Sequence, residues 1–266
     1  MKRSCRGRSN VQKIYIAMHK PYAVPKDALY VPLQVGAEGK KPFGAARDNE
    51  GENISEKNPG YCELTGLYWL RYHADADVVG LVHYRRYFVR RHWRFYQGEK
   101  RYLTAADVTR LMEKAELVLP KKRHYWIETT YSHYAHAHHE SDLKETRKVI
   151  EELCPAYTAA FDETMGRRSG HRFNMLIARR ELLQEYCDWL FPLLFELENR
   201  LDTSRYDDYN RRVFGFIGER LLDVWLCQRK QPYVECKVLE TERPNWLVKG
   251  VHFLWRKIRG NRTVSR

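Results

Sequence analysis

The stretch VVGLVHYRRYF, residues 78–88, changes character half-way along its length. Its first five residues are apolar and mostly β-branched, which is typical of a buried strand. The second half brings His83, Tyr84, Arg85 and Arg86. Because ligands of open α/β sheets bind at the carboxyl ends of strands, this order predicts a binding site where the strand ends. Two arginines among aromatic residues suit a ligand that carries phosphate and a ring; the alternative is a strand that runs into a solvated basic loop.

Strand-like and helix-like segments alternate on both sides of this stretch, which predicts an α/β layered fold in one domain. We expect strands at 13–18, 29–35, 117–119, 173–178 and 233–238, and helices at 61–73, 104–115, 142–153, 157–165, 180–201 and 207–228. Thr104 and Asp107 form a predicted capping box at the start of one helix. The expected organisation is a basic tail at 1–12, a domain at 13–242 and a basic amphipathic segment at 243–266.

The composition leaves several function classes open. The chain has 266 residues, 43% of them hydrophobic, and a net charge of +13. That charge fits nucleic acid, an anionic membrane surface or phosphorylated substrates. No run of roughly 18 apolar residues and no signal-peptide core is present, so we expect a cytoplasmic protein. The six cysteines lack Cys-x-x-Cys spacing, and we expect reduced thiols.

The last residues differ from the rest of the chain. After Glu242 there is no acidic residue, and Trp, Leu and Ile alternate with Lys and Arg near helical spacing. This pattern predicts an interfacial helix on anionic lipid, at the inner face of the plasma membrane. The alternative is a terminal helix that docks on the domain.

Three further patterns carry candidate chemistry. Asp75-Ala76-Asp77 matches a metal-binding Asp-x-Asp, but it precedes the central strand, so we expect it to end a helix and begin a turn. Four histidines within residues 133–139 suggest either a metal site or, as we prefer, a sugar-facing loop. Asp207 and Asp208 open a predicted helix, where they either complement its dipole or act as a general base.

Several motifs in order along the chain resemble a family of bacterial capsular and exopolysaccharide glycosyltransferases, long catalogued as a domain of unknown function. They are IYIAMHK at 14–20, NISEKNP at 53–59, YCELTGLYW at 61–69, GLVHYRRYF at 80–88, LPKKR at 119–123, YSHY at 131–134 and RRVFGF at 211–216. The resemblance covers about residues 13–239. It implies a GT-A-like, Rossmann-type mixed sheet flanked by helices, with a helical C-terminal part.

The resemblance also implies an activity and a site. Some relatives transfer galactopyranose or galactofuranose from a UDP sugar, so we expect a UDP-sugar donor and a lipid-linked or oligosaccharide acceptor. A divalent metal, Mg or Mn, stays open, because Arg85 and Arg86 stand where a metal motif is expected. The implied donor-binding residues are His19, Asn53, Ser55, Lys57, Asn58, Glu63, His83, Tyr84, Arg85, Arg86, Tyr87 and Arg212. The implied acceptor-binding residues are His133, His136 and Asn174, and the catalytic candidates are Asp207, Asp208 and Glu219.

Two other classes of protein compete with this interpretation. A nucleic-acid-binding protein fits the charge, although no known nucleic-acid motif is present and we expect no such partner. A transferase-like module that binds glycan or nucleotide without turnover is the second alternative.

Overall fold

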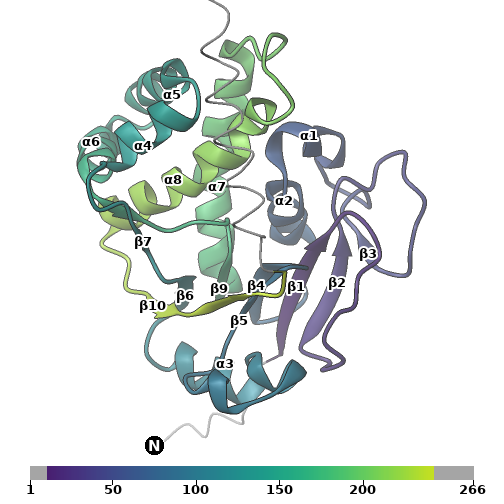
Figure 1. Cartoon of the computed structure of the whole chain (residues 1–266). Coiled ribbons are helices and arrows are strands. Elements are labelled where there is room, and N and C mark those ends of the chain that lie inside the picture. The colour runs from purple at the N-terminus through teal and green to yellow at the C-terminus, as the bar shows by residue number, and fades with distance from the viewer. Residues whose placement is uncertain (1–10, 243–266) are drawn as a thin grey trace, which may run out of the picture.

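The computed structural model describes residues 11–242, and strand β4 (Val78–His83) lies in the middle of its nine-stranded sheet (Figure 1). The predicted segment at 243–266 and nearly all of the predicted tail at 1–12 fall outside these residues. The strand order is β10-β6-β9-β4-β1-β2-β3, and β5 pairs with both β4 and β11. Strand β9 is antiparallel to its neighbours β4 and β6, and β5 is antiparallel to β4 and β11, whereas β1, β2, β3, β4, β6 and β10 pair in parallel. The predicted mixed sheet is confirmed.

The remaining strands are β1 (Gln12–Met18), β2 (Tyr30–Gln34), β3 (Ala46–Arg47), β5 (Arg86–Phe88), β6 (Leu117–Pro120), β9 (Leu176–Arg179), β10 (Val234–Cys236) and β11 (Val238–Glu240). A separate small sheet pairs β7 (Arg123–His124) with β8 (Ser169–Gly170). The helices are α1 (Asn58–Tyr61), α2 (Leu64–His73), α3 (Ala105–Met112), α4 (Thr130–Ala137), α5 (Glu140–Leu153), α6 (Thr158–Gly166), α7 (Arg180–Arg200) and α8 (Val213–Arg229).

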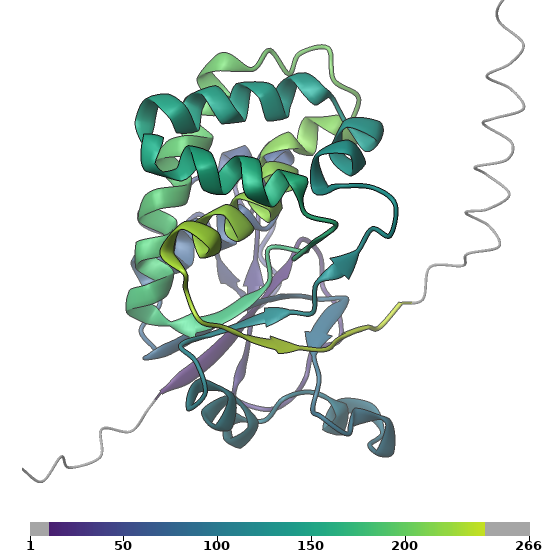
Figure 2. The same cartoon turned by 90° about the vertical axis from the view of Figure 1, so that its left-hand side faces the viewer.

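The sheet is buried on both faces, which explains its continuous apolar runs. Alternate residues of β1 enter two different cores: Tyr15 and Ala17 pack toward α2, α7 and α8, whereas Ile14 and Ile16 pack toward α3. Figures 1 and 2 show the same arrangement, with the large helical layer on one side of the sheet and α3 on the other. On β4, a Cβ added to Gly80 would lie 3.0 Å from Ile14 Cγ1 on β1. Glycine therefore lets the side chains of neighbouring strands meet over β4.

Most predicted elements are present, and the differences have local causes. The predicted helix at 61–73 is interrupted at Cys62, whose φ is 54°. The predicted helix at 207–228 begins only at Val213, after a 3₁₀ turn over Asn210–Arg212. The predicted strand at 173–178 begins only at Leu176, because Phe173 and Asn174 have left-handed φ values of 81° and 48°.

Other expectations hold. Thr104 and Asp107 form the predicted capping box at the start of α3. A second capping box, between Thr129 and Ser132, begins helix α4 inside a stretch for which no helix was predicted. The five cysteines among the described residues are free thiols. Of the helices described, none is long and apolar enough to cross a membrane.

Candidate functional site

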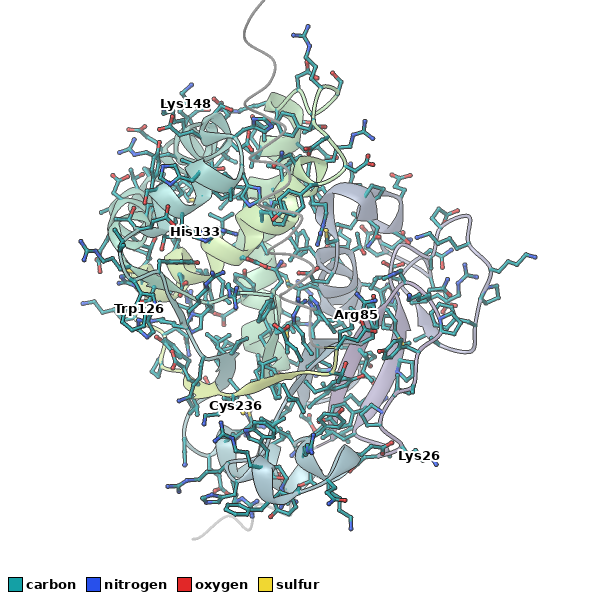
Figure 3. The ribbon with its side chains drawn as sticks, in the orientation of Figure 1. Lys26, Arg85, Trp126, His133, Lys148 and Cys236 are labelled. Carbon is teal, nitrogen blue, oxygen red and sulfur yellow. The ribbon has the colours of Figure 1, made fainter. Side chains whose placement is uncertain are left out.

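Five elements meet where β4 ends. They are the β4–β5 turn, the start of α2, the start of α8, the end of β1 and the segment that leads into β9. Because β9 runs antiparallel to β4, its first residues lie at the carboxyl end of β4. The topology thus brings residues 62–63, 83–86, 171–174 and 212–220 to one edge of the sheet, and Figure 3 labels Arg85 of this group.

Two carboxylates lie in this cluster. Glu63 Oε1 accepts a hydrogen bond from Asn174 Nδ2 at 2.8 Å and lies 3.6 Å from His83 Nε2. Glu219 Oε1 accepts from the backbone N–H of Phe173 at 3.0 Å, and its Oε2 accepts from Arg220 Nη1 at 3.1 Å. Burial, followed by the nearby charge of Glu63, raises the pKa of Glu219, and the charge of Arg220 opposes that rise.

Two guanidinium groups face the ring of Phe173. The guanidinium carbon of Arg86 lies 4.2 Å from the ring centroid, and that of Arg172 lies 4.6 Å from it. Burial, and then the charge of Arg123, lowers the pKa of Arg172. Among residues 11–242, Arg172 has no carboxylate within ion-pair distance. Two cations held beside one ring, one of them without a counter-ion, form a local positive field that suits a diphosphate.

His83 links the cations to the carboxylates. Its Nδ1 lies 3.3 Å from Arg86 Nη1. Because arginine only donates, Nδ1 is the acceptor in this contact, and the proton of the neutral ring is then on Nε2, which faces Glu63. Burial lowers the pKa of His83, while the charge of Glu63 opposes this and that of Arg86 reinforces it, so the neutral ring is favoured.

The backbone around the cluster is strained. Cys62, Phe173 and Asn174 all have positive φ, which costs a residue other than glycine about 1–3 kcal/mol. Two carboxylates from successive turns of α8 hold the strained segment. Glu219 accepts from the N–H of Phe173, and Asp223 accepts from the N–H of His171 at 2.8 Å. This support fixes the positions of Phe173 and Asn174 before any ligand binds.

Arg85 has a different environment from Arg86. Its Nε lies 2.8 Å from Glu242 Oε2, and Tyr22 donates to the other oxygen of Glu242 at 2.6 Å. The guanidinium of Arg85 also lies over Tyr84, at 4.9 Å from the ring centroid, and Tyr84 contacts the ring of His19 at the end of β1. The predicted donor residues His19, Tyr84 and Arg85 are therefore together. Both arginines have a carboxylate partner, but Arg86 Nε lies farther from its own, at 3.6 Å from Glu240 Oε1.

Tyr87 lies in the core, where it is 1% exposed and packs against Tyr30 and Tyr102. Arg212 Nε donates to Cys62 Sγ at 3.1 Å, which places this guanidinium beside the start of α2 and next to Glu63. Its role as a donor-binding residue stays a prediction, as does that of Tyr87.

The NISEKNP motif holds a loop in place. Its side chains bond within the fold: Asn53 to Gly51 and Ser55, Lys57 to Glu198 of α7, and Asn58 to Cys62 and Thr65. Ser55 donates to Asp48, a buried residue that sequence reasoning missed. Asp48 also accepts from the N–H groups of Gly36 and Ala37 and from the hydroxyl of Thr65. Contact of this motif with a donor stays a prediction.

The predicted acceptor residues separate into three environments. His133 on α4 stacks against Tyr125, with 4.3 Å between ring centroids, and its Nδ1 is buried without a hydrogen-bond partner among the described residues. His136 is mostly exposed and pairs with Glu128. Asn174 lies in the carboxylate cluster, bonded to Glu63. Only His133 and Asn174 of the three are therefore close to the groups around Glu219.

The two aspartates predicted as bases lie outside the buried cluster. Asp207 is exposed and accepts from the N–H of Asn210, the first residue of the 3₁₀ turn, at 2.7 Å. The side chain of Asp208 is fully exposed and lies 3.7 Å from Arg211. Glu219 is the one catalytic candidate of the three that the fold brings to the sheet edge.

Both the sequence and the fold of the chain are similar to those of known proteins. The sequence matches, over residues 13–230, the family described as a domain of unknown function (DUF4422). The chain belongs to this family. No curated protein matches the chain. A solved structure described as the WbbM bifunctional glycosyltransferase, in its apo form, shares the fold with a TM-score of 0.81 and 29% sequence identity. The match covers 88% of this chain but 46% of that one, so this DUF4422 chain spans about half of the WbbM chain.

The requirement for a divalent metal, Mg or Mn, stays open. Among the described residues, no three His, Cys, Asp or Glu side chains come together as metal ligands. Asp75 pairs with Lys13 at 2.7 Å, and Asp77 accepts from the N–H of Val11, so both lie at the opposite end of β1 and β4. The cations that the described chain itself brings to this edge are Arg86 and Arg172.

Sequence reasoning also missed His171, Arg172, Arg220 and Asp223. The signal was weak, because His171 and Arg172 stand directly before the strand predicted at 173–178 and match no motif of their own. In GHRFN, polar and aromatic residues come directly before an apolar strand, whereas at the end of β4 such residues come directly after one. Because β9 is antiparallel to β4, the start of β9 and the end of β4 lie at the same edge of the sheet.

Proposed function

We propose that this DUF4422 protein transfers a hexose from a UDP sugar to a growing surface polysaccharide of the capsular or exopolysaccharide kind. Galactopyranose and galactofuranose are the leading candidates for the sugar. One observation carries the proposal: Arg86 and Arg172 flank Phe173 at the carboxyl edge of the sheet, directly beside the carboxylates Glu63 and Glu219. The fold shared with a bifunctional glycosyltransferase supports it.

In the proposed reaction, an acceptor hydroxyl attacks the anomeric carbon of the donor. The bond from that carbon to the diphosphate oxygen breaks, and its electron pair leaves with UDP. Arg86 and Arg172 stabilise the charge that develops on the diphosphate, which is the kind of preorganised interaction that lowers such barriers. Neutral His83 holds Arg86 in position. A single displacement of this kind inverts the anomeric centre and needs one base.

Glu63 is the base that the contacts favour. Both oxygens of Glu219 are engaged, by the N–H of Phe173 and by Arg220. Glu63 is held through Oε1 by Asn174, which leaves Oε2 to accept a proton from the acceptor hydroxyl. Asp207 and Asp208 are less suitable because both are exposed to water.

We place the acceptor on the His133 side of the cluster and expect a lipid-linked glycan at the inner face of the plasma membrane. The residues from 243 onward, with their Trp, Lys and Arg, would supply part of the membrane contact in the cytoplasm. Deletion from Pro244 onward should then weaken binding to anionic liposomes. Unchanged binding of the shortened chain would contradict this role of the segment.

Turnover tests the proposed activity. The purified chain should release UDP from at least one UDP hexose in the presence of membrane extract that carries lipid-linked acceptors, and Glu63→Gln should lower the rate at least about 100-fold, the usual contribution of a general base. The matched control is Glu185→Gln, a carboxylate of α7 that pairs with Arg229 outside the cluster. UDP binding without turnover for any UDP hexose would instead support a non-catalytic module. Steeply salt-dependent binding of oligonucleotides, with no UDP binding, would support the nucleic-acid alternative.

A further inference from the structure

A second region of the protein has the properties of a binding site. A cavity of about 870 Å³ lies between α3, the segment 89–96 and strand β10, and it shares no residue with the cluster around Glu63. Figure 3 labels Cys236, which lines this cavity, below Arg85 and His133. The residues that line the cavity indicate which class of ligand it accepts.

The cavity has a rigid apolar floor. Apolar side chains from α3, β10 and the connection between β5 and α3 line it: Val89, Leu103, Leu111, Val234 and Cys236. Backbone hydrogen bonds fix the floor, from Lys121 N to Cys236 O at 3.0 Å and from Val89 N to Lys237 O at 2.9 Å. Because these bonds continue the sheet, the side chains of Lys121 and Lys237 project from an ordered frame rather than from a loose loop.

Positive charge dominates the rim. Six cations line the cavity, Arg90, Arg91, Arg110, Lys114, Lys121 and Lys237, against three carboxylates, Asp107, Glu113 and Glu235. Arg90 and Arg110 both pair with Asp107. Among residues 11–242, the other four cations have no carboxylate within ion-pair distance. The rim therefore carries four cations without an ion-pair partner among the described residues, and an anionic ligand would complement them.

An exposed aromatic side chain stands at the edge of the same cavity. Phe95 is 86% exposed and belongs to a 3₁₀ turn, Trp93–Phe95, whose neighbours His92 and Tyr96 line the cavity. Arg91 and Arg94 flank this turn in sequence. Aromatic residues with adjacent Arg are typical of a surface that enters the headgroup region of an anionic membrane. A soluble phosphate would not require an exposed phenyl ring at the rim.

We propose that this cavity binds the phosphate headgroup of an anionic membrane lipid, with Lys121 and Lys237 on the phosphate and Phe95 in the adjoining lipid. The inference rests on the membrane contact proposed above, and it adds a headgroup site within the folded domain. Figure 2 shows the segment between β5 and α3 on the same side of the molecule as the end of β11. The last described residue, Glu242, lies two residues after β11 and pairs with Arg85.

The test is co-sedimentation of the full chain with vesicles of phosphatidylcholine, with and without phosphatidylglycerol. Wild type should bind only the vesicles that contain phosphatidylglycerol. Lys121→Gln/Lys237→Gln should weaken that binding about thirtyfold, since each basic residue near an anionic surface contributes roughly 1 kcal/mol. Phe95→Ser should weaken it about tenfold without affecting the core, because this side chain is exposed. The matched control, Lys144→Gln/Lys148→Gln, removes the same charge from α5, far from Cys236 in Figure 3, and should change binding less than about twofold.

Three results would overturn the inference. Equal binding of the cavity variant and the α5 control would reject the cavity as a headgroup site, while leaving the proposed membrane contact intact. Failure of wild type to bind either kind of vesicle would reject both the headgroup site and the membrane contact, whereas UDP release would still decide the transferase proposal. Saturable calorimetric binding of inorganic phosphate that Lys121→Gln/Lys237→Gln abolishes, without any difference in vesicle binding, would assign the cavity to a soluble anion.

Discussion

Asn174 joins the strained backbone to the carboxylate cluster, so its substitution has a cost that the structure allows us to work out. The residue is buried, its φ is 48°, and its side-chain N–H₂ group donates to Glu63 Oε1 at 2.8 Å and to the carbonyl of Gly215 at 3.0 Å. Asn174→Ala removes both hydrogen bonds, one of them to a carboxylate. It also places alanine in the left-handed region, which asparagine tolerates better.

The expected loss is the sum of these effects. A hydrogen bond to a charged group contributes about 1.5–3 kcal/mol and one to a neutral group about 1 kcal/mol. The left-handed backbone adds about 1 kcal/mol for alanine. We therefore expect Asn174→Ala to lower the free energy of unfolding by about 4 kcal/mol. Asn174→Gly loses the same two bonds but not the backbone term, so it should be about 1 kcal/mol more stable than Asn174→Ala.

Urea denaturation followed by circular dichroism measures both differences, provided that the denaturant slopes of the three proteins agree. The order wild type, then glycine, then alanine is the predicted result. An alanine variant as stable as the glycine variant would refute the strain argument. A loss below about 1 kcal/mol in both variants would refute the hydrogen-bonding argument, since it is less than one charged bond contributes.

Two further predictions concern other buried carboxylates. Asp48→Ala should lower the free energy of unfolding by about 3–5 kcal/mol, because it removes the shared acceptor of four donors at a buried position. Urea denaturation of this variant beside the exposed Asp208→Ala tests the prediction. Burial raises the pKa of Glu219, so the folded state binds that proton more tightly than the unfolded state, and wild-type stability is expected to fall as the pH rises from the usual carboxyl range through the raised pKa. Glu219→Gln lacks this titration, so its stability relative to wild type should increase over that pH interval and be constant above it; a difference independent of pH would contradict the assignment.

The sequence predicted the fold because its signals are local and agree with one another. The apolar half of β4, the capping box of α3 and the long amphipathic pattern of α7 each specify an element, and their alternation specifies the layers. The positions at which predicted helices and strands are interrupted could not be predicted from the local sequence. Cys62, Phe173 and Asn174 adopt left-handed backbone conformations that nothing in their own identity requires, since tertiary contacts with α8 hold at least the last two.

The candidate site was predictable in part for the same reason. His83 and Arg86 follow a buried strand, so position alone places them at the sheet edge. Arg172 reaches that edge only because β9 runs antiparallel, and strand direction is a property of the whole sheet. Asp207 and Asp208 looked suitable as helix-opening carboxylates, but the helix begins five residues after Asp208, at Val213, and the turn leaves both aspartates in water.

The central claim is that Arg86 and Arg172, rather than a metal held by carboxylates, bind the diphosphate of a UDP sugar. Calorimetric titration of the full chain with UDP, in the presence of a chelator and then with Mn²⁺, tests it most directly. We predict binding in the chelator, weakened about 10- to 100-fold by Arg172→Gln, the loss expected for one charge-assisted hydrogen-bonding group. Arg147→Gln, a surface arginine of α5 that pairs with Asp162, should leave it unchanged. UDP binding that requires Mn²⁺ and does not respond to Arg172→Gln, or no UDP binding in either condition, would contradict the claim.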